Sequence, residues 1–144
     1  MRAGLLGAII CASMVTIDAQ GRGANAPPDL VRQVRTAIDS FHDDWRNGAI
    51  SKTGDGVSDD GFPKTLTVLV EGVEAGDAKG GVRKYLRRIP RDPFADASKD
   101  PEEQWSIRGY QDEADALSWN RIDVYDIRTT SEGTAIDGTS YENW

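Results

Sequence analysis

Apolar residues recur at helical spacing in one long stretch of the chain. Steps of four, four, three and four residues lay five of them along one stripe of a helix, and these are Leu30, Val34, Ile38, Phe41 and Trp45. Asp29 stands near the start of this stretch and Gly48 near its end, as helix termini prefer. The pattern predicts an amphipathic helix of about five turns.

A shorter apolar pattern follows. Residues 50–61 hold three glycines, three aspartates and two serines, which indicates a mobile surface loop. Pro63 stands where a first helical turn tolerates proline, and Leu66, Leu69 and Val70 give a short helix its buried face. Several glycines then end this helix in a flexible turn, and they are Gly72, Gly76, Gly80 and Gly81.

Two later stretches have the composition of strands. Residues 105–110 and 122–127 are rich in aromatic and β-branched residues, with a polar loop between them. We expect Trp45 and Trp105 to pack in the core. The sequence therefore predicts an α+β fold, in which an N-terminal amphipathic helix packs on a small antiparallel sheet and a C-terminal loop follows.

The first residues of the chain have the composition of an export signal. Met1 and Arg2 precede an apolar run from about Leu5 to Ile17, with a cleavage point expected after Ala19. This run is shorter than the roughly 20 residues of a membrane-spanning helix. We therefore divide the chain into an export leader at 1–19, a linker at 20–28 and one globular domain at 29–144. Any association with the inner membrane is expected to occur through the leader.

The charge is negative overall and unevenly distributed. A net charge of -7 argues against a nucleic-acid partner, because phosphate backbones demand a basic face. From Asp92 onward there are 13 acidic residues and only four basic ones. A basic run stands just upstream, and its candidate interface residues are Arg83, Lys84, Arg87, Arg88 and Arg91. This run is either a solvated face or a contact stripe for the acidic surface of a neighbouring subunit.

The residues that usually carry catalysis are sparse. His42 is the only histidine, and its neighbours Asp43 and Asp44 indicate a solvent-facing side chain. Cys11, the only cysteine, allows no intramolecular disulfide, and with one histidine and no reactive cysteine the sequence indicates no hydrolytic triad. The glycine spacing fits no nucleotide-binding loop. We therefore expect no enzyme and no small-molecule substrate. A hydrolase that uses carboxylates of the acidic C-terminal part is a weaker alternative.

The segment Gly61–Phe94 resembles the core of the major pseudopilin family of type II secretion systems. In that family GYP-x-x-L-x-x-L opens a short segment after the long N-terminal helix, and L-x-x-IP-x-DPF leads into the sheet; this chain reads GFPKTLTVL and LRRIPRDPF. The likeness covers about the last two thirds of the chain. Its further matching positions are Trp105, Gly109–Tyr110, Asp123–Asp126, Ser131–Gly133 and Asn143–Trp144.

This resemblance implies a function and partners. It implies a subunit or accessory of a type II secretion machine, which docks with other pseudopilins or secretion subunits in the periplasm or at the periplasmic face of the inner membrane. Mature pseudopilins begin with phenylalanine, have glutamate as their fifth residue and continue as an unbroken apolar helix. Here the first phenylalanine is Phe41 and the first glutamate is Glu71. Either the start of the chain is incomplete or replaced, or the alternative holds, a free-standing exported binding or scaffold domain of this fold that does not polymerise.

The resemblance also implies a calcium site in the last loop, residues 129–143. Its candidate ligands are Ser131, Glu132, Thr134 and Asp137, and calcium accepts such oxygen shells. The family's loop commonly supplies two aspartates, whereas this loop has Asp137, with Glu132 as the substitute. The alternative is a loop closed by Asx and Ser/Thr turns, without a metal.

Overall fold

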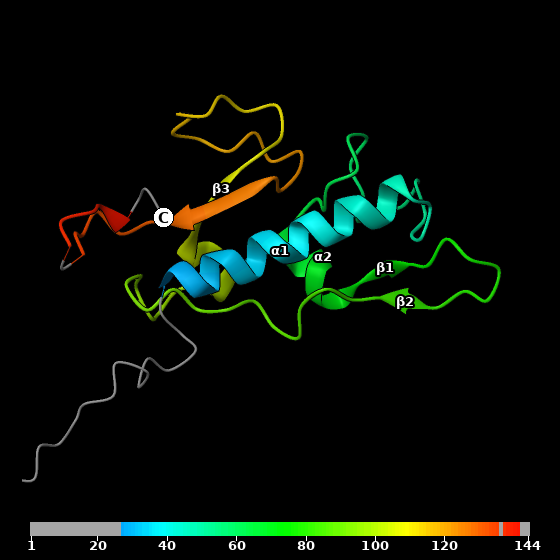
Figure 1. The fold of residues 1–144 in the computed structure, drawn as a ribbon, viewed down its shortest axis with the longest axis horizontal. Coiled ribbons are helices and arrows are strands. Elements are labelled where there is room, and N and C mark those ends of the chain that lie inside the picture. The colour runs from blue at the N-terminus through cyan, green and yellow to red at the C-terminus, as the bar shows by residue number, and fades with distance from the viewer. Residues whose placement is uncertain (1–26, 136, 142–144) are drawn as a thin grey trace, which may run out of the picture.

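The computed structural model describes residues 27–135 and 137–141, and one long helix organises them (Figure 1). This helix, α1, spans Pro27–Arg46 and confirms the predicted amphipathic helix. It begins within the expected linker, because proline is tolerated in a first helical turn. Its inward stripe is fully buried at Val34, Ile38 and Phe41. After the helix, Gly48 adopts a left-handed conformation with φ +73°.

The second helix, α2, is short and is capped from a distant part of the chain. It spans Leu66–Glu71 and buries Leu66 and Leu69, as predicted. Glu102 accepts hydrogen bonds from the Leu66 backbone N–H at 2.9 Å and from the Thr67 hydroxyl at 2.8 Å, which satisfies one of the free donors of the first turn. Pro63 lies before this helix and not in its first turn, so that part of the prediction is wrong.

The glycine-rich segment after α2 is a β-hairpin rather than a plain flexible turn. Strands β1 (Val73–Glu74) and β2 (Val82–Arg83) pair antiparallel, with Val73 opposite Arg83. Gly72 starts the hairpin with φ +90°, and a Cβ there would lie 2.4 Å from the Val82 side chain. Two-residue strands leave too short an alternating pattern for the sequence to reveal them.

A second antiparallel pair forms the sheet that packs beside α1. A 3-10 turn at Pro101–Gln104 leads into β3 (Trp105–Arg108), which pairs with β4 (Asp126–Thr129) so that Ile107 faces Ile127. The first predicted strand is confirmed, while the second begins four residues later than predicted.

The start of β4 is delayed because the residues before it bond to other segments. The buried Asp123 carboxylate accepts hydrogen bonds from the Tyr110 backbone N–H at 2.8 Å and the Ser58 hydroxyl at 3.2 Å. The Val124 N–H donates to the Pro63 carbonyl at 2.7 Å. These bonds hold Asp123 and Val124 to segments outside the sheet, and the chain joins β3 at Tyr125, whose N–H donates to the Arg108 carbonyl at 2.9 Å.

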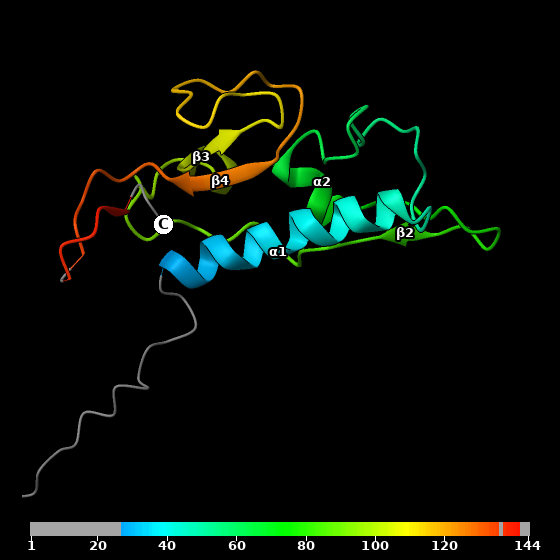
Figure 2. The same ribbon diagram turned by 45° about the horizontal axis from the view of Figure 1, so that its top comes forward.

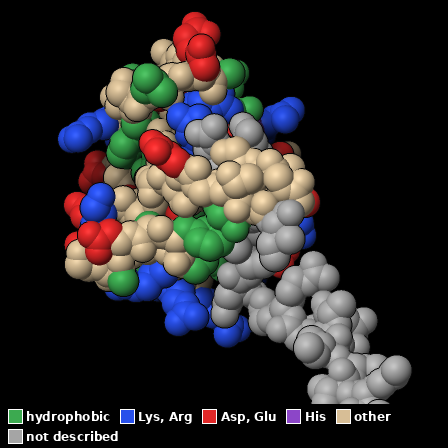
Figure 3. All heavy atoms as spheres, turned by 90° about the vertical axis from the view of Figure 1, so that its left-hand side faces the viewer, with side chains coloured by type: hydrophobic (Ala, Val, Ile, Leu, Met, Phe, Trp, Pro, Cys, Tyr) green, Lys and Arg blue, Asp and Glu red, His purple; other side chains and the backbone are tan. Residues whose placement is uncertain are grey.

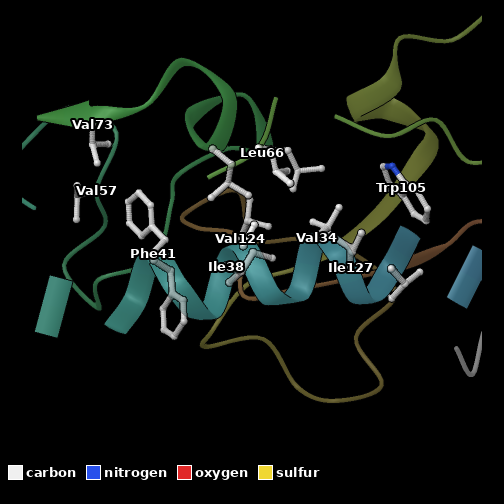
Figure 4. Close-up of a cluster of buried hydrophobic side chains, with 14 of the residues drawn as sticks. Val34, Ile38, Phe41, Val57, Leu66, Val73, Trp105, Val124 and Ile127 are labelled. Atoms are coloured by element: carbon white, nitrogen blue, oxygen red, sulfur yellow. The ribbon is translucent and has the colours of Figure 1, made fainter. Parts of the chain in front are cut away.

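One hydrophobic core joins these elements (Figure 4). Val34 and Ile38 of α1 pack in the same cluster as Leu66 of α2, Trp105 of β3 and Ile127 of β4. Figure 2 shows α1 running beside the β3–β4 pair, with α2 near the end of the pair at which β4 begins. The arrangement of helices with two small antiparallel sheets is α+β, as expected.

The expectation of a mobile surface loop at residues 50–61 is wrong in part. Ile50, Val57 and Ser58 are buried, and Ile50 forms a β-bridge with Ala75. Two isolated apolar residues among glycines and aspartates carry no periodic signal, so the composition concealed their role in the core.

Candidate functional site

The basic run after β2 is attached to the body of the molecule by its backbone. The N–H groups of Tyr85 and Leu86 both donate to the Leu69 carbonyl of α2, each at 2.9 Å. The Leu86 side chain is buried beside α1 and α2. Lys84, Arg87 and Arg88 flank this anchored pair and are exposed. These two bonds hold the main chain between the three cationic side chains in place.

Two of the five predicted interface residues have partners within the chain. Arg83 forms an ion pair with Asp44 of α1, with Nε 2.9 Å from Oδ2. Arg91 donates to the carbonyls of Ala97 and Lys99 at 3.2 and 3.3 Å. Arg83 therefore links the basic run to α1, and Arg91 links it to residues 97–99. Both side chains already have acceptors within the chain.

The other three, Lys84, Arg87 and Arg88, form no hydrogen bond or ion pair with any described residue. They line an open groove beside α1, which we call the basic groove. Its lining residues from α1 are Asp29, Arg32, Gln33, Thr36, Ala37 and Ser40, and from the basic run Lys84, Tyr85, Leu86, Arg87 and Arg88.

The basic groove carries four cations and one acid. Arg32 pairs with that acid, Asp29, at 3.2 Å on the exposed helix surface, where such a pair is weak. Ala37 and Leu86 are buried and form an apolar base. Figure 3 shows Lys and Arg side chains gathered along the lower edge of one face of the molecule. A hollow with this excess of positive charge attracts acidic groups. The contribution of Arg32 was not predicted, because it depends on how α1 lies against the basic run.

Tyr85 connects the basic groove to α1. Its hydroxyl donates a hydrogen bond to Asp44 at 2.8 Å, and Asp44 also pairs with Arg83. Burial, and then the hydrogen bond to Asp44, raise the pKa of Tyr85 well above its ordinary value. Tyr85 therefore stays a neutral donor over the whole physiological range.

His42 is half-buried between two aromatic rings, so the expectation of a solvent-facing side chain is wrong in part. The imidazole stacks on Phe62, with ring centres 4.2 Å apart, and on Trp45 at 5.6 Å. Its Nδ1 lies 3.2 Å from the Gly61 carbonyl. Phe62 belongs to the Gly61–Phe94 segment, and no periodicity around residue 42 shows that this segment folds over the helix.

Trp105 is buried in the core as expected, whereas Trp45 is only partly buried at its edge.

Asp92 of the RIPRDPF stretch has a structural role. It is buried, and its carboxylate accepts hydrogen bonds from the Thr129 hydroxyl and, at 2.9 Å, from the Phe94 N–H. Its own N–H donates to the Gln104 side chain at 3.1 Å. A buried carboxylate needs such partners, and here they fasten the segment to the end of β4.

The expected calcium loop is closed by its own turns. Asp137 Oδ1 accepts hydrogen bonds from the Thr139 backbone N–H at 3.0 Å and from its hydroxyl at 2.6 Å, and these bonds lower the pKa of Asp137. The Ser131 hydroxyl accepts from the Gly133 N–H at 3.2 Å, and Thr134 bridges to Ser140. Glu132 is exposed.

The side chains of this loop do not by themselves complete a calcium shell. Nowhere in residues 27–135 and 137–141 do three His, Cys, Asp or Glu side chains gather into a metal-binding group. The loop offers an ionised Asp137, and backbone oxygens would have to supply most of the six to eight ligands.

The N-terminal expectations, an export leader at 1–19 and most of the linker at 20–28, lie outside the described residues, as does the end of the last loop at Asn143–Trp144. Within the part that the structure describes, no helix has the length and apolarity needed to cross a membrane. Comparison with known proteins gave no match among family models, curated proteins or solved structures.

Proposed function

We propose that this chain is a non-enzymatic subunit or accessory of a type II secretion machine, exported to the periplasm or the periplasmic face of the inner membrane, and that it acts by docking with other proteins. The motif order GFPKTLTVL and LRRIPRDPF supports the family, through its resemblance to major pseudopilins. Possession of calcium in the last loop belongs to the same proposal.

The observation that carries the docking role is the basic groove. Three of its cations, Lys84, Arg87 and Arg88, are exposed and form no ion pair with any residue that the structure describes. Lysine and arginine side chains that share one hollow and lack internal partners favour an acidic protein surface, since opposite charges steer association and set its register.

Capture from cells tests this role. The full chain, tagged and expressed with a type II secretion system, should co-purify with its pseudopilins. Lys84→Gln/Arg87→Gln/Arg88→Gln should reduce the capture. The matched control Arg46→Gln/Lys64→Gln/Lys79→Gln, which neutralises three exposed cations outside the groove, should not. A chain that never associates with secretion components contradicts the proposal.

The mature N-terminus separates the two forms of the proposal. A methylated N-terminal residue on a longer product supports a filament subunit. A cut near Ala19 supports the free-standing exported domain, which would dock without polymerising. Mass spectrometry of the intact exported protein distinguishes these products directly.

A further inference from the structure

A hollow lies along β3, and the loop that joins β3 to β4 forms one of its walls. Its volume is about 430 Å³, at the lower end of the roughly 300–1,000 Å³ of small-molecule sites. Figures 1 and 2 show this loop on the side of the two strands away from α1. The lining of the hollow includes Ser106 and Ile107 of β3, Leu117 and Trp119 of the loop, and Glu103 just before β3.

The wall of the hollow has apolar surface that water still reaches. Leu117 is 97% exposed, and Ile107 and Trp119 are half-buried. Trp105 also lines the hollow but contributes little, because it is only 4% exposed. A ligand that covers Leu117, Ile107 and Trp119 therefore gains hydrophobic contact that the folded chain does not make by itself.

Hydrogen bonds hold this apolar wall in place. The Trp119 indole N–H donates to the Asp123 carbonyl at 2.6 Å. The Arg128 guanidinium donates to the Ala116 carbonyl, next to Leu117, at 3.1 Å, and Arg128 itself does not line the hollow. The loop is thus tied to β4 and to the residues before it. A wall that is already ordered reduces the entropy cost of binding.

One carboxylate at the hollow has no partner among the described residues. Glu103 is exposed, and its side chain forms no hydrogen bond or ion pair with any of them. The neighbouring Glu102 is engaged at α2, where it accepts hydrogen bonds from Leu66 and Thr67. No lysine or arginine stands among the described residues that line the hollow. An apolar wall beside an unpaired carboxylate is complementary to an apolar group that carries a positive charge.

We propose that this hollow binds a small aromatic amine. The ring of the ligand covers Leu117, Ile107 and Trp119, and its ammonium group lies near the Glu103 carboxylate. Trp119 adds an aromatic face, which favours both a stacked ring and a nearby cation. An anionic ligand is disfavoured, because Glu102 and Glu103 repel it. This binding site goes beyond the proposed docking function, and no reaction is assigned to it.

Indole compounds of similar size and different charge test the site. Tryptamine is the cation at neutral pH, tryptophol its uncharged counterpart and indolepropionate the anion. Each is added to the full chain while the indole N–H signals of the protein are followed by NMR, and Trp119→Phe identifies the Trp119 signal. Tryptamine should shift this signal saturably with a Kd below about 10 mM. The signal of Trp45, which does not line the hollow, should stay in place. Tryptophol should bind about threefold more weakly, as expected for loss of an exposed ion pair, and indolepropionate more weakly still.

Single substitutions separate the charge from the apolar wall. Glu103→Gln should abolish the preference for tryptamine over tryptophol and leave tryptophol binding unchanged. Leu117→Ser should weaken the binding of both compounds about threefold or more. The matched controls Glu113→Gln and Ile122→Ser change an exposed acid and an exposed isoleucine outside the hollow, and they should bind as the wild type does. Circular dichroism verifies that all variants fold.

The amine site is refuted by any of these results: no saturable shift of the Trp119 signal up to about 10 mM tryptamine, equal affinity for tryptamine and tryptophol, or a preference for tryptamine that survives Glu103→Gln. Such a result leaves the proposed docking role standing, because the hollow and the basic groove share no lining residue. A chain that binds tryptamine but captures no secretion component refutes the proposed function alone.

Discussion

Arg35 of α1 and Asp126 of β4 form a two-point contact between the helix and the sheet. Arg35 Nε lies 2.6 Å from Asp126 Oδ1, and Nη2 lies 3.4 Å from Oδ2. The same guanidinium donates to the Ile127 carbonyl at 3.2 Å, and Arg108 Nη2 lies 3.6 Å from Asp126 Oδ2. This contact fixes α1 along β4, which aligns the helix that forms one wall of the basic groove.

Replacing Arg35 by glutamine should lower the free energy of unfolding by about 1 kcal/mol, because a partly exposed charged hydrogen-bond pair is worth roughly that much. Urea denaturation measures the change. Arg32→Gln is the matched control, since its partner Asp29 lies on the exposed helix surface, and a change below about 0.5 kcal/mol is expected. Equal losses in the two variants would show that the contact between α1 and β4 carries no special weight.

Gly61 should not tolerate alanine. Its φ is +81°, and a Cβ would lie 2.2 Å from the Trp45 ring. Gly61→Ala therefore combines backbone strain with a steric overlap and should cost about 2 to 4 kcal/mol.

Gly48 is the control for that prediction, since its φ is +73° and no atom lies within 4 Å of a built Cβ. Gly48→Ala should cost about 1 kcal/mol, the strain alone. Thermal unfolding of both variants separates the two effects. A Gly61 variant no less stable than the Gly48 variant would mean that Trp45 moves aside freely.

Alkaline pH should destabilise the protein through Tyr85. The folded-state pKa of Tyr85 is raised above the ordinary value of 10.0, so the unfolded chain loses the phenol proton first as pH rises. The contribution of neutral Tyr85 to the free energy of unfolding is fully present below about pH 10, and it declines as pH rises toward the folded-state pKa. Ultraviolet titration of phenolate should reveal one late-titrating tyrosine that Tyr85→Phe removes.

The exposed Tyr110 provides the comparison for this titration. Tyr110→Phe should leave the late-titrating group in place. Loss of that group in the Tyr110 variant, or its persistence in the Tyr85 variant, would assign the raised pKa to another side chain.

Calcium binding has its own measurement. If the last loop binds calcium through Asp137, millimolar calcium should raise the melting temperature, and Asp137→Ala should abolish the rise. Thr139→Ala, which removes the hydroxyl donor to Asp137, should keep the calcium effect because it frees carboxylate oxygen for the metal. No shift at millimolar calcium would refute the site.

The parts of the fold with a strong local period could be predicted from the sequence. The stripe from Leu30 to Phe41 follows a helical repeat over several turns, and its residues are buried as expected. The two-residue strands of the β1–β2 hairpin are too short for any repeat. The burial of Ile50 and Val57 depends on segments that only the folded chain brings beside them.

The candidate site was predictable as a charge pattern and not as a surface. A run of basic residues is visible in the sequence, but the sequence does not show which of them pair within the chain and which stay available for a partner. Arg83 pairs with Asp44, which lies 39 positions earlier, whereas Arg87 has no such partner among the described residues. Arg32 joins the groove only because α1 packs against the basic run. Spatial neighbours of this kind leave no trace in local spacing.

The two hydrogen bonds from Tyr85 and Leu86 to the Leu69 carbonyl separate the shape of the basic groove from its chemistry. Main-chain bonds do not depend on the identity of the exposed side chains at 84, 87 and 88. Related chains could therefore exchange these side chains and acquire different binding preferences without refolding. For protein engineers, these three sites form a platform on which new recognition can be installed while the scaffold stays constant.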